Sequence, residues 1–219
     1  MHALAARAVI VLIVTCLGVP QAFAQGPFDA PPGPYAVDLG VGTTALPAEA
    51  AFYPPLADGA FVPARGLGLA VGAHVYLFHV GPGRLGVGVA VLSASGHATT
   101  PVAEAGSEGE RTEPSVARVN GTYRIVAPQV SLNFGTARGW SYVSGGVGAA
   151  RFTSTITPGQ LEAGSGWVRG LNVGGGARWF LRDRVGVGFD LRLHGLGSSA
   201  QAGTSGAVTF AAVAGLTLR

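Results

Sequence analysis

The sequence predicts an all-β protein, an eight-stranded antiparallel up-and-down transmembrane β-barrel. Eight stretches alternate apolar residues with glycine or polar residues, and this period of two indicates strands whose two faces meet different environments. Charged residues make up 11% of the chain and hydrophobic residues 48%, whereas soluble domains average about 25% charged residues. After the N-terminal residues 1–24, no segment holds the roughly 18 consecutive apolar residues of a membrane helix. The apolar residues are therefore distributed over strands.

The alternation is clearest in the segment Trp167–His194, which we interpret as an antiparallel hairpin with a short polar turn at Arg182 and Asp183. In its second half, apolar residues alternate with glycine and polar residues: Val185, Val187, Phe189, Leu191 and Leu193 against Gly186, Gly188, Asp190, Arg192 and His194. A soluble sandwich would turn the apolar face inward, but the other face offers lone glycines and mid-strand charges rather than a solvated surface. A closed barrel in lipid explains the pattern better, with apolar side chains outward and a narrow polar lumen.

Residues 1–24 have the features of a cleavable signal peptide. A weakly positive start leads into the apolar run Ala8–Val19, and Ala22–Ala24 forms an A-x-A cleavage site. This run is too short to span a bilayer. Lipid modification of Cys16 is the alternative, but Thr15 is a poor match to the small residue expected before such a cysteine. Signal cleavage leaves a mature chain without cysteine, which excludes disulfides, thiol nucleophiles and thiolate metal sites.

The chain after the signal divides into a short leader and the barrel. Residues 25–33 are rich in glycine and proline without a pattern, which indicates a flexible periplasmic leader, and residues 34–219 form the barrel. Alternation predicts strands at about 34–46, 66–78, 85–91, 123–134, 140–152, 167–180, 185–194 and from 207 onward. Short turns at 79–83, 135–139 and 182–183 alternate with longer connections at 47–65, 94–117, 154–166 and 198–205. An even strand count with this asymmetry is typical of bacterial outer-membrane barrels.

Two of the predicted strands depart from the simple pattern. Near the middle of the fourth strand, Pro128 cannot donate a hydrogen bond to a ladder. Tyr123 and Ile125 stand on the opposite phase from Val130, so we expect a bulge near the proline. The fifth strand is rich in glycine, and the direction in which its side chains face is ambiguous.

The aromatic residues fall near the two ends of the predicted strands, as the interfacial girdles of a membrane barrel require. One group lies near the short turns: Tyr35, Tyr76, Phe78, Phe134, Trp140, Tyr142 and Trp179. The other lies near the longer loops: Tyr123, Phe152, Trp167 and Phe210.

Three segments of the chain resemble the small outer-membrane β-barrel superfamily, which includes the OmpA transmembrane domain, OmpX and the opacity-type adhesins. They are Tyr142–Gly148, Leu171–Phe180 and Val187–Arg192, and the resemblance covers about residues 34–219. It implies a location in the bacterial outer membrane, with outer-membrane lipid and the barrel-assembly machinery as partners. The chain departs from the family at Arg219, where the family's assembly signal usually ends in an aromatic residue, and no peptidoglycan-binding anchor is implied.

Five polar residues share the lumen phase of the predicted strands: Asp38, His74, Arg178, Asp190 and Arg192. Because the predicted sixth and seventh strands are neighbours, we expect Arg178 to pair with Asp190 across them and Arg192 to join the pair. An eight-stranded barrel is barely wide enough for its own side chains. A charge-paired plug would block diffusion, while a lumen lined by glycine could instead pass water or a small solute.

The predicted connection at 47–65 is unusually apolar for a loop. Phe52, Tyr53, Leu56 and Phe61 lie within it. We favour a lid folded onto the barrel mouth, and the alternative is an exposed contact patch that touches an extracellular partner.

The residues provide little support for other functions. The nearest pair for a lipid-modifying enzyme is His194 with Ser198, whose spacing does not match such enzymes, so no enzyme activity is expected. His74 and His194 lack a third metal ligand, the glutamates within 94–117 match no calcium loop, and no cofactor is expected. Loss of Arg7 with the signal lowers the net charge from +3 to +2, which does not suggest nucleic acid. We expect a structural or surface-interaction protein with an unknown extracellular partner, and alternatively a narrow channel.

Overall fold

The computed structural model describes residues 33–56, 59–101 and 116–219, all within one compact unit, Pro31–Arg219. The described residues do not include the predicted signal peptide or the leader up to residue 32. They also leave out residues 102–115 of the connection predicted at 94–117. None of the helices in the described segments is long and apolar enough to cross a membrane.

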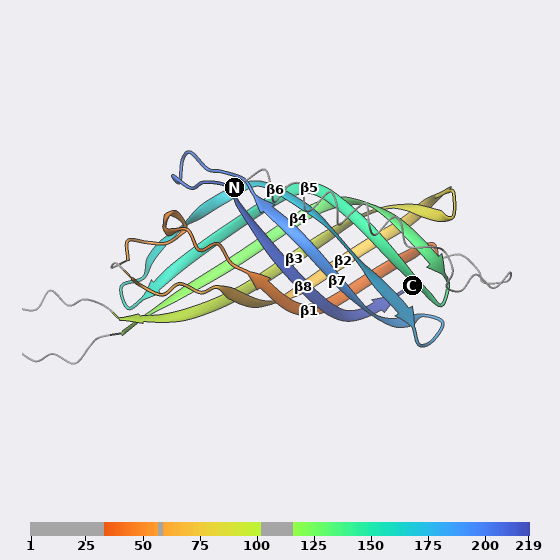
Figure 1. The fold of residues 1–219 in the computed structure, drawn as a ribbon, viewed down its shortest axis with the longest axis horizontal. Coiled ribbons are helices and arrows are strands. Elements are labelled where there is room, and N and C mark those ends of the chain that lie inside the picture. Colours follow the sequence, from red (N-terminus) through yellow and green to blue (C-terminus); the bar gives the residue numbers. More distant parts are fainter. Residues whose placement is uncertain (1–32, 57–58, 102–115) are drawn as a thin grey trace, which may run out of the picture. The chain divides into compact units, whose positions relative to one another are not determined.

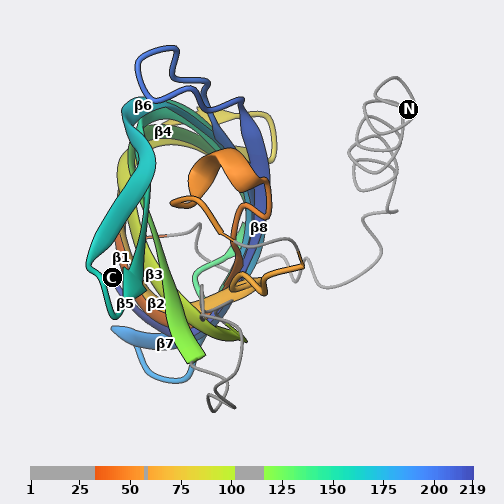
Figure 2. The same cartoon turned by 90° about the vertical axis from the view of Figure 1, so that its left-hand side faces the viewer.

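Eight antiparallel strands form a closed barrel in which each strand pairs with its neighbours in sequence and β1 pairs with β8 (Figure 1). The strands are β1 (Tyr35–Ala45), β2 (Arg65–Val80), β3 (Gly83–Pro101), β4 (Val116–Thr136), β5 (Gly139–Thr157), β6 (Leu161–Phe180), β7 (Val185–Leu196) and β8 (Ala207–Leu218). A short 3-10 helix, η1 (Ala50–Phe52), lies in the connection between β1 and β2. Viewed end-on, the strands form a ring, with η1 at its near end (Figure 2). The predicted fold class is confirmed.

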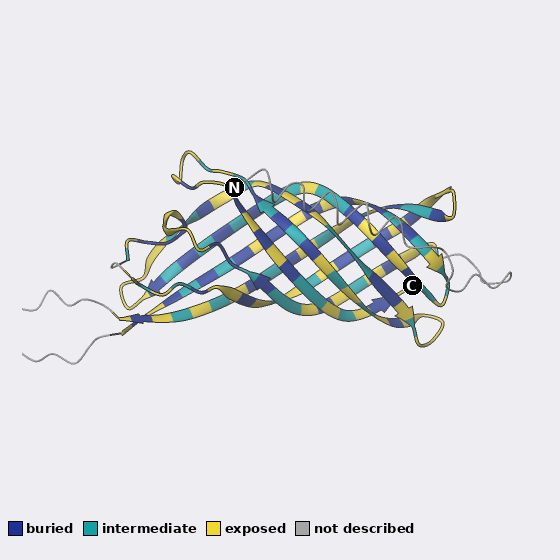
Figure 3. Cartoon of the chain, in the orientation of Figure 1, coloured by how far each residue is buried: buried dark blue, intermediate teal, exposed yellow. Residues whose placement is uncertain are grey.

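Burial alternates between successive residues along most of each strand (Figure 3). On β7, Val187, Phe189 and Leu191 are exposed, whereas Arg192 and His194 are buried. The buried phase faces the lumen because a ring of strands encloses only one interior. The outer face therefore carries a continuous belt of exposed valine and leucine, such as Leu69 at 58% exposure, which suits contact with lipid and not with water.

The strands of the central hairpins are longer than predicted. β3 and β4 remain paired to Pro101 and Val116, and β5 and β6 are joined by the three residues 158–160 instead of a loop at 154–166. Beyond the belt the outward side chains of these strands are polar, while lumen-facing residues such as Val119 and Phe152 are apolar. The pattern of apolar side chains on the outer face therefore ends, although the backbone ladder continues. The predicted loop lengths were wrong at this end for that reason.

The bulge expected near Pro128 is absent. β4 keeps one register along its whole length against β3, where Pro128 lies opposite Val89, and the ladder to β5 only omits residues 127–129. Tyr123 and Ile125 are buried in the lumen phase together with Gln129. The apparent change of phase arose because the lumen itself becomes apolar toward the loop end. The register shifts lie elsewhere, at Tyr76/Phe78 and at Phe152/Thr153.

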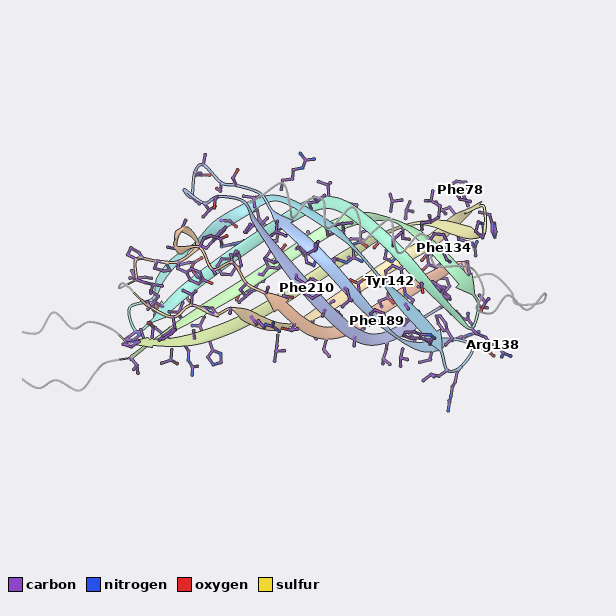
Figure 4. The ribbon with its side chains drawn as sticks, viewed as in Figure 1. Phe78, Phe134, Arg138, Tyr142, Phe189 and Phe210 are labelled. Carbon is purple, nitrogen blue, oxygen red and sulfur yellow. The ribbon has the colours of Figure 1, made fainter. Side chains whose placement is uncertain are left out.

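The aromatic girdles contain fewer residues than predicted. Tyr35, Phe78 and Trp179 are exposed at the short-turn end, and Trp167 and Phe210 are exposed toward the loop end, while Phe134 is half-buried on the outer phase (Figure 4). The other predicted members face the lumen and are buried: Tyr76, Trp140, Tyr142, Tyr123 and Phe152. The prediction used the position of each residue along its strand and ignored its phase. On β5 the same alternation resolves the facing, with Val143 and Val147 outward.

Candidate functional site

The first part of the site is an ion pair that crosses the lumen between two strands that are not neighbours. Arg178 on β6 donates from Nε and Nη2 to the two carboxylate oxygens of Asp38 on β1, at 2.9 and 2.6 Å. Thr217 on β8 donates a third hydrogen bond to the same carboxylate, at 2.6 Å. The Arg178 side chain is only 2% exposed, so its charge depends on Asp38 for compensation.

The second part is an ion pair within one strand. Asp190 and Arg192 are two residues apart on β7 and therefore share the lumen face, where Arg192 donates to both carboxylate oxygens at 2.9 and 2.7 Å. Arg192 also donates to Asn172 on β6 and to Ser144 on β5, each at 2.8 Å. Its guanidinium group is thus held by three strands.

Tyr142 on β5 connects the two ion pairs. Its hydroxyl donates to Asp190 at 2.7 Å, and the guanidinium carbon of Arg178 lies 3.9 Å from the centre of its ring. Two positive and two negative groups are thereby brought together with no net charge. A Cβ added at Gly176 would clash with the Phe189 carbonyl oxygen and lie 2.9 Å from the Tyr142 hydroxyl, so the neighbouring backbone and this hydroxyl require glycine at this lumen position.

A chain of amides extends the site across the lumen. Asn172 accepts from Gln129 on β4 at 2.8 Å, and Gln129 in turn accepts from Nε2 of His74 on β2 at 3.2 Å. We call the whole set the lumen network: Asp38, His74, Gln129, Tyr142, Ser144, Asn172, Arg178, Asp190, Arg192 and Thr217. Every strand except β3 contributes a residue to it.

All five residues of the predicted lumen cluster face the interior and belong to the network, but the expected pairing of Arg178 with Asp190 is wrong. Their positions on neighbouring strands do not oppose each other, because Arg178 lies opposite Gly188 and Asp190 opposite Gly176. The long arginine side chain instead reaches Asp38 across the barrel. Five members of the network were not predicted, although their phase on the strands indicates the lumen: Gln129, Tyr142, Ser144, Asn172 and Thr217.

A small cavity of about 90 Å³ lies beside the network. Network residues such as His74 and Asn172 line part of it. Small residues line much of the rest, on strands that contribute few network members: Gly40, Ala70, Gly72, Ala90 and Ala211. The cavity is large enough for a few water molecules and has polar partners for them.

The connection between β1 and β2 closes the loop end of the lumen. Phe52 and Tyr53 pack edge-on against Phe152 on β5, with ring centres 5.7 and 5.6 Å apart. Ser154 donates to the Phe52 carbonyl and the Tyr53 hydroxyl donates to the Pro47 carbonyl, both at 2.6 Å. Burial raises the pKa of Tyr53. We call residues 46–56 the lid, and Figure 2 shows its helical turn inside the ring of strands.

The structure contradicts an exposed patch made of all four predicted contact residues. Phe52 and Tyr53 are buried, and Leu56 is partly buried against the same cluster, because the lid places its apolar side chains over the apolar end of the lumen. Only Phe61 is exposed, at 64%. The lid interpretation describes this connection better.

The residues considered for catalysis and metal binding lie apart from any such arrangement in the described segments. His194 is buried in the lumen with its ring 5.9 Å from that of Tyr123, whereas Ser198 is exposed in the connection after β7. Within residues 33–56, 59–101 and 116–219, no group of three or more histidine, cysteine or acidic residues could hold a metal ion.

Comparison with solved structures identifies the fold. Neisserial surface protein A (NspA) aligns with a TM-score of 0.52 and 13% identity over 85% of this chain and 97% of NspA. The chain has the fold of the small outer-membrane β-barrels. The attachment invasion locus protein Ail of Yersinia pestis (TM-score 0.48, 10% identity, 84% and 97% coverage) and the outer membrane protease OmpT of Escherichia coli (0.44, 9%, 90% and 99%) are also similar. No family model and no curated protein matches the sequence.

Proposed function

We propose that this chain is an integral protein of the bacterial outer membrane that acts as a structural and surface-interaction barrel and does not conduct solutes. The observation that supports this role is the obstructed lumen, with the lumen network across it and the lid over its loop end. Passage of an ion would require the buried guanidinium of Arg178 or Arg192 to lose its carboxylate, and leaving a buried charge unpaired costs about 3–5 kcal/mol.

The interaction surface in this proposal consists of the outer ends of β3 to β6. These strands extend past the apolar belt, and their outward side chains there are polar, as at Ser95, Thr122 and Thr155. Paired strands hold these side chains in fixed positions, which lowers the entropy lost when a partner binds. The partner is an extracellular molecule that meets the barrel from the outer side.

Planar-bilayer recording tests the non-conducting part of the proposal. The purified barrel should insert and show no unitary conductance in salt solution. Barrel-expressing cells should also bind a host-cell or abiotic surface more strongly than cells expressing a variant with Ser95, Thr122 and Thr155 changed to glutamate. Steady unitary currents from the wild-type barrel, or equal binding by the two kinds of cell, would contradict the proposal.

A narrow passage for water is the second candidate, and the cavity beside Gly72 and Ala90 favours it. Small residues such as these leave space beside the network for water. Stopped-flow measurement of osmotic shrinkage in proteoliposomes separates the two candidates, since a water passage would accelerate shrinkage without ionic current. A lipid-modifying enzyme, the remaining hypothesis, gains no support because His194 is enclosed by the barrel while a lipid substrate lies outside it.

A further inference from the structure

Three outward-facing arginines lie at the same distance from the short-turn end of the barrel. Arg124 on β4, Arg151 on β5 and Arg169 on β6 each follow the outer phase of their strand. Each is ten residues from an outward residue near the opposite end: Phe134, Ser141 and Trp179, respectively. A strand tilted by about 40° rises about 2.6 Å per residue along the barrel axis, so ten residues span about 26 Å. The apolar band of such barrels is about 25 Å high, which places these arginines at its outer edge.

The strand register brings the three positive charges close together. Arg124 lies directly opposite Arg151, and Arg169 lies opposite Ala149, the next outward residue of β5 below Arg151. Directly opposed side chains on one face are separated by about 5 Å at Cβ, where like charges destabilise a sheet. An anion bound between these arginines would remove this repulsion.

Acidic side chains in the described residues compensate this cluster only in part. Glu162 is 3.5 Å from Arg151, but both side chains are solvent-exposed, at 58% and 38%, and such pairs contribute little. Arg124 and Arg169 are exposed, and no ion pair is found for either in the parts of the chain that the structure describes. Trp167, opposite Arg151, is 55% exposed and supplies the aromatic ring that is common at headgroup level.

We propose that Arg124, Arg151 and Arg169, the arginine cluster, bind the phosphate groups of an anionic lipid of the outer leaflet. Guanidinium groups bind phosphate through two parallel hydrogen bonds, and three of them on adjacent strands can hold more than one phosphate. The cluster faces outward at the edge of the apolar belt, where a lipid headgroup meets the barrel. A phosphorylated glycolipid with several acyl chains fits this site, because its chains can lie along the belt below the arginines. The inference depends on the proposed membrane location and is independent of whether the lumen conducts.

Lipid binding can be measured by native mass spectrometry on the refolded barrel in detergent, with bisphosphorylated lipid A as probe. The test variant is R124Q/R151Q/R169Q, and R138Q/R182Q/R184Q is its matched control, since it removes the same charge from exposed arginines at the short-turn end. Each basic residue near an anionic surface strengthens binding about fivefold, so the test variant should bind about a hundredfold more weakly. The control variant should bind like the wild type.

The source of the phosphate is distinguished by two further probes. Dephosphorylated lipid A should bind as weakly as phosphatidylcholine, and inorganic phosphate should not displace bisphosphorylated lipid A. Equal loss of binding in the control variant, unchanged binding in the test variant, or displacement by inorganic phosphate would overturn the inference. Resistance of both variants to unfolding in cold detergent verifies that each is folded, and planar-bilayer recording of the same samples tests the proposed function separately.

Discussion

At the scale of single residues, the two arginines of the lumen network differ in how they are compensated. Arg178 has Asp38 as its carboxylate partner, and its Nη1 atom has no hydrogen-bond partner among the described residues. Arg192 keeps Asn172 and Ser144 even when Asp190 is neutralised. The two ion pairs therefore contribute unequally to stability.

We expect Asp38→Asn to lower the free energy of unfolding by about 3–5 kcal/mol, because it leaves the Arg178 charge buried without a counter-charge. Asp190→Asn should lower it by about 1–3 kcal/mol, because the remaining hydrogen bonds still hold Arg192. Urea unfolding in detergent micelles measures both values, with the exposed Asp183→Asn as control. Equal effects of the two substitutions would show that the hydrogen bonds of Arg192 to Asn172 and Ser144 do not compensate for the loss of the Asp190 charge.

At the scale of strands, the outward phase of β7 and β8 specifies which side chains meet lipid. Phe189 lies near the middle of the belt, whereas Val208 lies ten residues from Leu218, at the outer edge. Both side chains are exposed on the outer face, so they differ mainly in depth.

We expect Phe189→Arg to destabilise the barrel by about 2–4 kcal/mol in lipid and Val208→Arg by about 0–1 kcal/mol, because the cost of an arginine falls toward the interface. Unfolding in phospholipid vesicles, followed by tryptophan fluorescence, measures the difference. A lumen glycine is a poor control here, since a Cβ at Gly188 would lie 2.8 Å from the Ala177 carbonyl oxygen. A smaller effect at Phe189 than at Val208 would contradict the assignment of the lipid face.

How much the sequence predicts also differs between strands. The alternation of β7 placed Asp190, Arg192 and Phe189 on their correct faces, because one face meets lipid and the other does not. The outer ends of β3 to β6 were missed because their outward side chains are polar there and their apolar residues, such as Val119 and Ile156, face the lumen. The partner of Arg178 could not be predicted because its side chain crosses to β1, and strand neighbours alone do not specify such a contact.

At the scale of the whole molecule, the lid and the lumen network form two barriers in series. Phe52 is fully buried in the loop end, and the Asp38–Arg178 pair crosses the lumen on network strands. The removal of one barrier leaves the other in place. Under the proposed function, both must be lost before ions can pass.

We expect neither Phe52→Ala nor the double variant Asp38→Ala/Arg178→Ala to conduct in planar bilayers, and the triple variant to show small unitary currents. The double variant removes both partners, so no buried charge is left unpaired. The double variant Asp183→Ala/Arg184→Ala, at the short-turn end, serves as control. Currents from Phe52→Ala alone would mean that the lid is the single barrier.

The hydrogen bonds of Asp38 also join the two edges of the sheet. Its partners Arg178 and Thr217 are 140 and 179 residues away in sequence, and the pairing of the first strand, β1, with the last strand, β8, closes the ring. Contacts so distant in sequence carry a large loop-closure cost, so we expect them to form late in folding. Asp38 therefore stabilises the closed ring after the ring has formed. Its loss should increase the rate of unfolding of the barrel and leave the rate of folding nearly unchanged.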